Sequence, residues 1–337
     1  MPFTRHALLF LAAVAAQPAR AEPTRYPLSV DNCGSRLTFA TAPQRAVTIG
    51  QSATEIVYSL GLGAQLAGTS LWFNPVLPAY ADIDARVPRL ADNQPSFETV
   101  INKRPDLVAA QFEWSVGAQG AVATREQFND LHIPAYVMPS DCQGKNNQVG
   151  ADGTRLQPFR IDSLYQSIDE LAAIFDVSDR GSALKQRLHD RLHAAQARLA
   201  TPAPTATSVA FWFSSADLAS DPYMAGRKGV PDYMASTLGL RNVVQSDEEW
   251  PTVGWESIAK ANPTVLVIAR MDRRRFPADD YRKKLEFLAS DPVARQLDAV
   301  RHGRVVILDA QSMEASVRLF DGIEALAEAI DGFDLQP

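Results

Sequence analysis

The chain has 337 residues, 46% of them hydrophobic, and a formal net charge of −6. This length and apolar content suit two domains with one core each. A mean hydropathy of −0.14 excludes a protein built of many membrane spans, and the acidic balance argues against nucleic acid as a partner, because a phosphate backbone needs a basic surface.

The N-terminus has the pattern of a secretory signal peptide. A short basic stretch precedes the apolar run Ala7–Ala16, and Ala19-x-Ala21 is a small-residue cleavage pattern. The run is shorter than the roughly 20 residues that a membrane-spanning helix needs. We therefore expect residues 1–21 to be removed. No cysteine stands at the cleavage point itself, which predicts a free periplasmic protein and not a lipoprotein.

The two cysteines, Cys33 and Cys142, are predicted to form one disulfide, as an even pair does in an oxidising compartment. Neither has a CxxC partner or a neighbouring histidine, which disfavours the alternatives of a thiol catalyst or a metal site. The bond would tie a predicted hairpin, residues 27–41, to a Gly-, Asn- and Asp-rich loop at 140–157.

Alternating strands and helices follow the hairpin. The first unit is a strand over Arg45–Ile49 and a helix that ends at Gly61. Ser52 is its predicted N-cap, with Glu55 completing a capping box. Because such units recur, we expect an α/β fold of two doubly wound lobes, with a ligand cleft between them at the carboxyl ends of the strands. The lobes would span residues 22–160 and 204–337.

A helical segment, residues 161–203, separates the two lobes. Apolar residues repeat along it at helical spacing. The repeat is interrupted at Asp176–Asp179, so the second stretch, about 179–199, is the predicted bridging helix.

The two halves repeat each other at fixed landmarks. Leu60-Gly61-Leu62 and Leu238-Gly239-Leu240 each end the first helix of a half. Glu98 and Glu256 each follow an aromatic residue, and each is followed seven residues later by a proline and then a strand. The shared order indicates two lobes of one design.

Several stretches together resemble the iron-siderophore and cobalamin class of periplasmic substrate-binding proteins of ABC importers. These stretches cover nearly the whole chain after the signal in the family's order; they are Pro43–Val47 through Thr54–Ile56 to Leu60–Leu62, Val87–Leu90, Phe97–Glu98 to Pro105–Val108, Trp255–Glu256 to Pro263–Leu266, and Gly303–Val306. The resemblance implies two lobes joined by one rigid helix, capture of a small ligand, and delivery to a membrane permease.

The family's two docking carboxylates fall on Glu98 and Glu256, one in each lobe. Each would pair with arginines of the importer's membrane subunits through charge-assisted hydrogen bonds. A glutamate in the first turn of a helix is also favourable to its own helix dipole, and that explanation stays open for either residue alone.

Aromatic and basic residues follow the predicted strands and are candidates for the cleft. They suit a bulky planar or aryl-bearing ligand and, where arginines face inward, an anionic ferric siderophore. The candidates are Trp72, Phe112, Trp114, Trp212, Trp250, Arg270 and Arg318. Core packing is the alternative for each tryptophan, and a solvated loop is the alternative for Arg273–Arg275.

A bare metal ion is disfavoured as ligand or cofactor. His189 and His193 are four apart on the predicted bridge, but they fall on a charged face, which favours simple exposure. Haem would need an axial ligand, for which Tyr223 is available. We therefore expect a ferric siderophore, with a corrinoid second and haem third, and a monomeric protein without a cofactor of its own.

Two other classes of function remain as alternatives. The sequence Ile49–Ala53 resembles a nucleophile elbow with Ser52 as nucleophile, but its second glycine is missing and no acid and histidine follow at suitable strand ends. A periplasmic sensor would use the same fold without an importer. The paired glutamates argue against the sensor, and catalysis is not expected.

Overall fold

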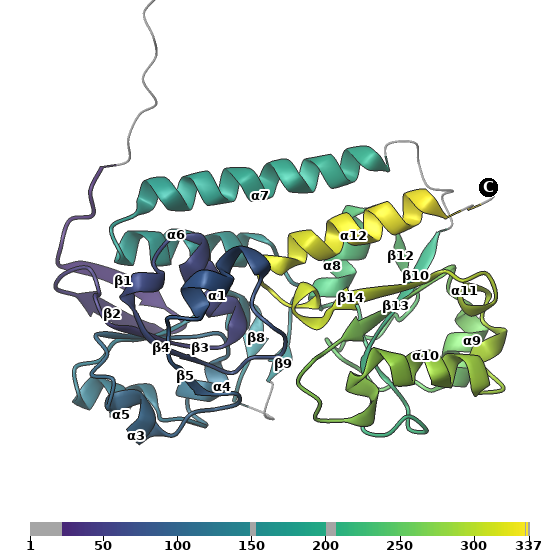
Figure 1. Cartoon of the computed structure of the whole chain (residues 1–337), viewed down its shortest axis with the longest axis horizontal. Helices are drawn as coiled ribbons and strands as arrows, with labels where there is room; N and C mark the ends of the chain where they lie inside the picture. The colour runs from purple at the N-terminus through teal and green to yellow at the C-terminus, as the bar shows by residue number, and fades with distance from the viewer. Residues whose placement is uncertain (1–21, 149–152, 200–206, 334, 336–337) are drawn as a thin grey trace, which may run out of the picture.

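The computed structural model describes residues 22–148, 153–199, 207–333 and 335. Two α/β lobes lie side by side, and the long helix α7 runs along one side of both (Figure 1). This is the two-lobed α/β fold expected from the sequence. The predicted signal peptide, residues 1–21, lies outside the described residues.

The N-terminal lobe is built on a parallel sheet of strand order β5-β4-β3-β6-β7. Its central strand β3 is buried along its whole length, as in parallel sheets that are covered on both faces. The strands are β3 Ala46–Ile49, β4 Leu66–Ser70, β5 Arg89–Ala91, β6 Leu107–Ala110 and β7 Ala135–Val137; the helices are α1 Gln51–Ser59, α2 Ala81–Asp84, α3 Phe97–Ile101, α4 Glu113–Val116 and α5 Arg125–Asp130.

The C-terminal lobe repeats this plan. Strand β10 pairs in parallel with β12 and β13, β13 pairs with β14, and β11 adds an antiparallel edge. The strands are β10 Ser208–Ser214, β11 Tyr223–Met224, β12 Arg241–Asn242, β13 Val265–Arg270 and β14 Val305–Asp309; the helices are α8 Val230–Thr237, α9 Trp255–Ala261, α10 Tyr281–Ser290, α11 Asp298–Arg301 and α12 Arg318–Gly332.

The backbone confirms the internal repeat. Gly61 and Gly239 both have positive φ angles, 71° and 69°. In each case the residue after the glycine donates its N–H to a carbonyl five residues back, 3.1 Å for Leu62 and 2.9 Å for Leu240. This is the helix-ending geometry that a C-terminal glycine favours, and it occurs at the same place in both lobes.

Two helices connect the lobes. Helix α6 spans Asp162–Ile174 and α7 spans Ser178–Arg198, against the predicted bridge of about 179–199. Asp176, with φ of 57°, breaks the path between them. Polar contacts join α7 to both lobes: Arg180 donates to Leu60 O of the N-terminal lobe over 3.1 Å, and Arg191 pairs with Glu324 of α12 in the C-terminal lobe. Because it contacts both lobes, α7 restricts their relative motion.

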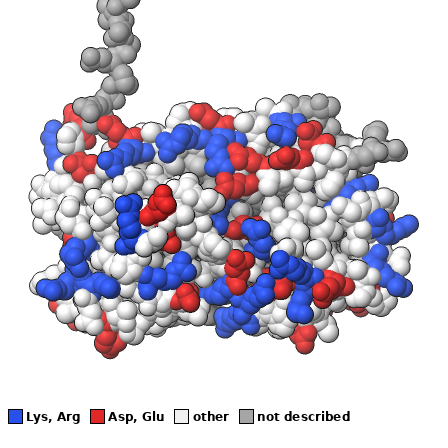
Figure 2. All heavy atoms as spheres, in the orientation of Figure 1, with Lys and Arg blue, Asp and Glu red and all other residues white. Residues whose placement is uncertain are grey.

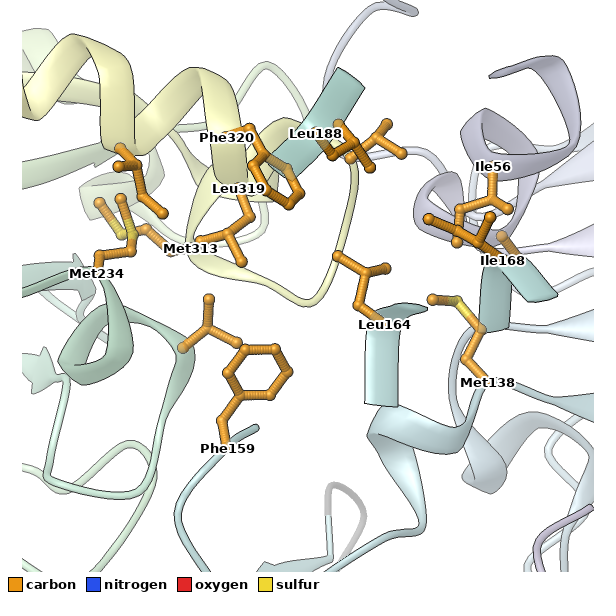
Figure 3. Close-up of a cluster of buried hydrophobic side chains, with 14 of the residues drawn as sticks. Ile56, Met138, Phe159, Leu164, Ile168, Leu188, Met234, Met313, Leu319 and Phe320 are labelled. Atoms are coloured by element: carbon orange, nitrogen blue, oxygen red, sulfur yellow. The ribbon is translucent and has the colours of Figure 1, made fainter. Parts of the chain in front are cut away.

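One hydrophobic cluster continues through both lobes beneath α7 (Figure 3). Leu164 and Ile168 of α6 enter it from one side and Leu319 and Phe320 of α12 from the other, all buried. Separating the lobes would expose this shared apolar surface, which costs free energy.

The N-terminal hairpin is formed by β1 Leu28–Asn32 and β2 Ser35–Phe39. Cys33 and Gly34 make its two-residue turn, both with positive φ, as hairpin turns of this length require. The predicted disulfide between Cys33 and Cys142 is present, with the two Cα atoms 5.6 Å apart. Within the described residues, no helix has the length and apolar character needed to cross a membrane.

Candidate ligand-binding site

The carboxyl ends of the strands of both sheets meet at the boundary between the lobes. Ser52 Oγ, just after β3, donates to Gln311 Oε1, just after β14, over 3.0 Å. Asn74 Nδ2, after β4, donates to Asp309 Oδ1 at the end of β14 over 2.7 Å. Open α/β sheets bind ligands at these strand ends, especially where the strand order reverses. The reversals lie between β3 and β6 and between β10 and β13.

A buried ion network forms the base of this boundary. The Arg318 guanidinium donates to Glu55 Oε2 over 2.8 Å, to Glu55 Oε1 over 2.5 Å and to Asp309 Oδ2 over 2.7 Å. Burial alone would lower the pKa of Arg318, yet the hydrogen bonds and charges of Glu55 and Asp309 together raise it. Arg318 was a candidate ligand residue. The structure places it instead in a contact that holds the lobes together.

The capping box predicted for α1 is wrong. Helix α1 begins at Gln51, its N-cap is Gly50 with φ of 118°, and no side chain caps it. The Ser52 N–H donates to Gln111 Oε1 over 2.9 Å. A Cβ on residue 50 would lie 2.3 Å from the Gln111 side chain, so glycine is needed there for space as well as for φ. Glu55 is therefore free to bind Arg318.

A clasp formed by Phe73–Asn74 and Arg270–Arg273 crosses one side of the boundary. Phe73 O accepts the N–H groups of Asp272 and Arg273 over 3.2 and 2.9 Å. The Arg273 guanidinium lies 4.0 Å from the centre of the Phe73 ring. Gln51 Oε1 holds this loop from within its own lobe by accepting the N–H groups of Phe73 and Asn74, each at 3.1 Å.

A second set of charged side chains lies at the boundary around Glu314. Arg155, in β9 Thr154–Arg155 of the N-terminal lobe, pairs with Glu249 of the C-terminal lobe over 3.0 Å. Lys145 and Asp141 pair over 2.6 Å. Both pairs act electrostatically on Glu314, and burial together with the negative charge of Glu249 raises the pKa of Glu314 to about 8. The carboxyl groups of Glu314, Glu249 and Asp141 thus outnumber the two cations that act on Glu314, Lys145 and Arg155, by one.

Two of the aromatic candidates are core residues. Trp212 is fully buried and packs edge-on against Trp255, with ring centres 4.9 Å apart. Its Nε1–H donates to Ser214 O over 3.1 Å, so the ring is satisfied within its own lobe. Trp72 is also buried, and its indole donates to Thr69 Oγ1 over 3.2 Å. Neither presents a free aromatic face to a ligand.

The other three aromatic candidates are half-buried near the boundary. Phe112 and Trp114 follow β6, where the strand order of the first sheet reverses. Trp250 packs on Phe213, with ring centres 4.6 Å apart, and is adjacent to Glu249 of the inter-lobe pair. Arg270 is exposed at the end of β13, and its carbonyl accepts from Asn74 Nδ2 over 3.4 Å. These four residues remain candidates for ligand contact.

Glu98 and Glu256 occupy matching places in the two lobes. Each is exposed and is the second residue of a short helix, α3 in one lobe and α9 in the other. Helix α3 has its own cap, Ser96, whose hydroxyl accepts the Thr99 N–H over 3.2 Å. Helix α9 has Gly254 at its N-cap position and no side-chain cap, so neither glutamate acts as the cap of its helix.

The remaining candidates have ordinary local explanations. His189 and His193 are exposed, with their Nε2 atoms 3.1 Å apart, and no cluster of three or more metal-binding side chains occurs in the described ranges. Tyr223 is half-buried in β11. The Ser52 hydroxyl contacts Gln311 and not a histidine.

A hollow of about 690 Å³ lies beside the disulfide and not at the base of the boundary. It is lined by Cys33, Cys142 and Gln166, and reaches Glu113 and Lys145 at one edge. Every residue that lines it belongs to the N-terminal lobe or to α6, so the hollow is not formed between the lobes.

Sequence reasoning missed several boundary residues, namely Asn74, Asp309, Gln311 and Glu249. The usable signal was position: Gln311, like Gln111, is a buried polar residue that comes within two residues of the end of a strand. A polar side chain placed there must find a partner, and in this fold the partner lies in the first turn of α1.

Comparisons with known proteins agree with this architecture. The sequence profile of the family described as "Periplasmic binding protein" matches residues 47–312. An uncharacterized ABC transporter substrate-binding lipoprotein of Bacillus subtilis is 25% identical over 307 residues, which cover 90% of this chain and 86% of the relative.

Solved structures share the fold. A periplasmic binding protein from Veillonella parvula aligns with a TM-score of 0.75 at 22% identity, over 91% of this chain and 98% of that one. A protein of an ABC-type Fe3+-hydroxamate transport system from Saccharomonospora viridis gives 0.70 at 23%, over 90% and 99%. A periplasmic heme binding protein from Pseudomonas aeruginosa gives 0.66 at 21%, over 88% and 95%. By its matched sequence and its two-lobed fold, this chain belongs to the periplasmic binding protein family.

Proposed function

We propose that this protein is the periplasmic solute-binding component of an ABC importer and that its ligand is an iron chelate of the ferric-siderophore type. The observation that carries the proposal is the meeting of the carboxyl ends of both sheets at one boundary, where Phe112, Trp114, Trp250 and Arg270 lie partly or fully exposed. Export as a free protein after removal of residues 1–21 is part of the proposal.

Delivery to the membrane is assigned to Glu98 and Glu256. Two exposed carboxylates at matching positions in two similar lobes suit a partner made of two similar subunits. Arginine is the natural counterpart, because a guanidinium binds a carboxylate with two parallel hydrogen bonds.

Two observations support the proposed ligand class: the side chains near the boundary and the names of two similar structures. Half-buried aromatic rings offer stacking surfaces to chelating aryl groups or to a macrocycle. One similar structure belongs to an Fe3+-hydroxamate transport system and another is a heme binding protein. The sequence placed a corrinoid ahead of haem, but the similar heme binding protein makes haem the second candidate ligand, with Tyr223 as the available axial oxygen, and a corrinoid the third.

Tryptophan fluorescence of residues 22–337 tests the proposal. The protein is titrated with ferric siderophores and their iron-free forms, with haemin and with cobalamin, with correction for absorption by the ligand. Saturable quenching by a ferric siderophore at micromolar concentration or below, and not by its iron-free form, is the expected result. Quenching by haemin or cobalamin alone would replace the siderophore with that ligand, and a protein that binds none of the probes would contradict the iron-chelate assignment.

A further inference from the structure

The loop that follows β13 concentrates positive charge at the boundary between the lobes. Six Lys or Arg residues and three Asp residues lie between Arg270 and Lys283, in a chain whose net charge is −6. Figure 2 shows basic side chains gathered between α10 and the lobe boundary. The local sign is thus opposite to that of the whole protein. We call Arg270–Arg275 the arginine lip.

Buried groups of the C-terminal lobe hold the lip from below. The carboxylate of Asp279, itself buried, accepts the N–H groups of Arg275 and Phe276 over 2.6 and 2.9 Å. Lys284, also buried, donates to Ala269 O over 2.8 Å and to Phe213 O over 2.5 Å, at the ends of β13 and β10. The backbone of the lip is therefore placed before any ligand arrives.

The other lobe holds the lip from the side. Besides stacking on Phe73, the Arg273 guanidinium donates to Asn93 Oδ1 over 2.9 Å. Arg273 is therefore engaged in a contact between the lobes. Arg274 forms an ion pair within its own lobe, with its Nη2 atom 3.3 Å from Asp280 Oδ2. In the part of the chain that the structure describes, Arg270 and Arg275 are exposed and form no ion pair. They are the two lip arginines whose charge is available to a ligand.

Their position matches that of a ligand site. Arg270 ends β13 at the point where the strand order of the second sheet reverses, and it pairs in register with Asp309 of β14. Cations with fixed positions at the edge of a cleft raise the local concentration of anions and speed their association about 10- to 1,000-fold. A neutral ligand gains nothing from this field.

We propose that the arginine lip selects anionic ligands, with Arg270 and Arg275 attracting a chelate of net negative charge into the boundary between the lobes. The inference rests on the proposed function and narrows it to a charge class: a ferric tris-catecholate or a dicarboxylate such as haemin, rather than a neutral tris-hydroxamate. The attraction acts before the ligand makes contact, so it depends on charge and ionic strength and not on hydrogen-bond geometry.

Stopped-flow quenching of tryptophan fluorescence tests the proposal with three probes: ferric enterobactin, haemin and the neutral ferrichrome. The variants are Arg270→Gln/Arg275→Gln and, as a conservative pair, Arg270→Lys/Arg275→Lys. Arg241→Gln/Arg301→Gln serves as the matched control. It removes the same charge from the same lobe, and Arg241 pairs with Ser208 at the opposite end of the sheet.

The expected result has three parts. The association rate constant of an anionic probe falls about tenfold or more in the glutamine pair at 50 mM NaCl, as removal of a steering charge predicts. The lysine pair retains most of the rate, and the control pair retains nearly all of it. Raising the salt to 500 mM lowers the wild-type rate and removes most of the difference between the variants.

Three results would overturn the inference. One is a glutamine pair that associates with an anionic probe as fast as the control pair. Another is binding of ferrichrome but of neither anionic probe, which would leave the iron-chelate function intact and remove only the charge selection. The third is binding of none of the probes, which would remove both. Thermal unfolding of each variant shows whether a slow rate reflects misfolding.

Discussion

Arg318 in α12 and Glu55 in α1 form a buried, two-pronged ion pair across the boundary of the lobes, with N–O distances of 2.8 and 2.5 Å. The Arg318 side chain is 6% exposed and that of Glu55 0%. The pair joins the two lobes, and Asp309 of the C-terminal lobe also accepts a hydrogen bond from Arg318, over 2.7 Å. The pair therefore stabilises the contact between the lobes and not the fold of either lobe alone.

Replacing Arg318 with Met should lower the free energy of unfolding by about 3–5 kcal/mol, because Glu55 would stay fully buried without a counter-charge. Urea unfolding followed by circular dichroism measures the loss. The control is Arg198→Met on α7, whose exposed pair with Asp331 spans 3.9 Å and should be worth less than about 1 kcal/mol. Equal losses in the two variants would contradict the role given to the buried pair.

Stability should fall as the pH rises from 5 to 9, in part because of Glu314. Burial and the charge of Glu249 raise its pKa to about 8, whereas an unfolded glutamate titrates near about 4.3. Between these values the folded state holds a proton that the unfolded state has lost, so raising the pH favours unfolding. This contribution is fully present below the unfolded pKa and is lost as the pH passes the folded pKa.

The measurement is the urea midpoint of wild type and Glu314→Gln at pH 6 and pH 9. The glutamine variant should lose less stability between the two pH values than wild type does. Glu248→Gln, at an exposed position, is the control and should follow wild type. If the midpoint of Glu314→Gln shifts as much as that of wild type, Glu314 does not titrate in this range.

Removing the disulfide should destabilise the protein by about 2–5 kcal/mol, because the bond closes a long loop in the unfolded chain. Cys33 and Cys142 are 109 residues apart in sequence. Unfolding of Cys33→Ser/Cys142→Ser in urea, with and without dithiothreitol, measures the effect. Wild type should lose stability on reduction while the double variant does not change, and a wild type insensitive to reduction would contradict the prediction.

Ala substitution of both Glu98 and Glu256 should leave ligand affinity unchanged and reduce uptake in cells at least about tenfold, since a charge-assisted hydrogen bond contributes about 1.5–3 kcal/mol. Iron-limited growth and radiolabelled uptake measure the loss. Glu126→Ala, an exposed first-turn glutamate of α5, is the control. Normal uptake by the double variant would rule out the docking role.

The repeat of the two lobes could be predicted from a few residues, because a helix end that needs a positive φ angle favours glycine at one position. Gly61 and Gly239 both adopt positive φ at helix ends, a conformation that glycine adopts at little cost. The bridging helix was likewise predictable to within a residue at each end, since its apolar positions repeat at helical spacing.

The candidate site was harder to predict because local rules compete with distant partners. Ser52 and Glu55 satisfy a capping-box pattern, yet Gln111, Gln311 and Arg318 engage the same groups in the folded chain. Trp212 lies in a strand that is buried on both faces. Residue spacing in such a strand does not distinguish a core position from a ligand-facing one.

The sequence by itself determined the strand and helix units, their twofold repeat, the bridging helix and the cysteine pair, because each follows from local periodicity, backbone constraint or residue chemistry. Only the tertiary structure decided which polar groups face each other across the boundary. Arg318 meets Glu55, and Asp309 meets Asn74, through the packing of two lobes, and contacts between residues more than 200 positions apart leave no local pattern in the chain.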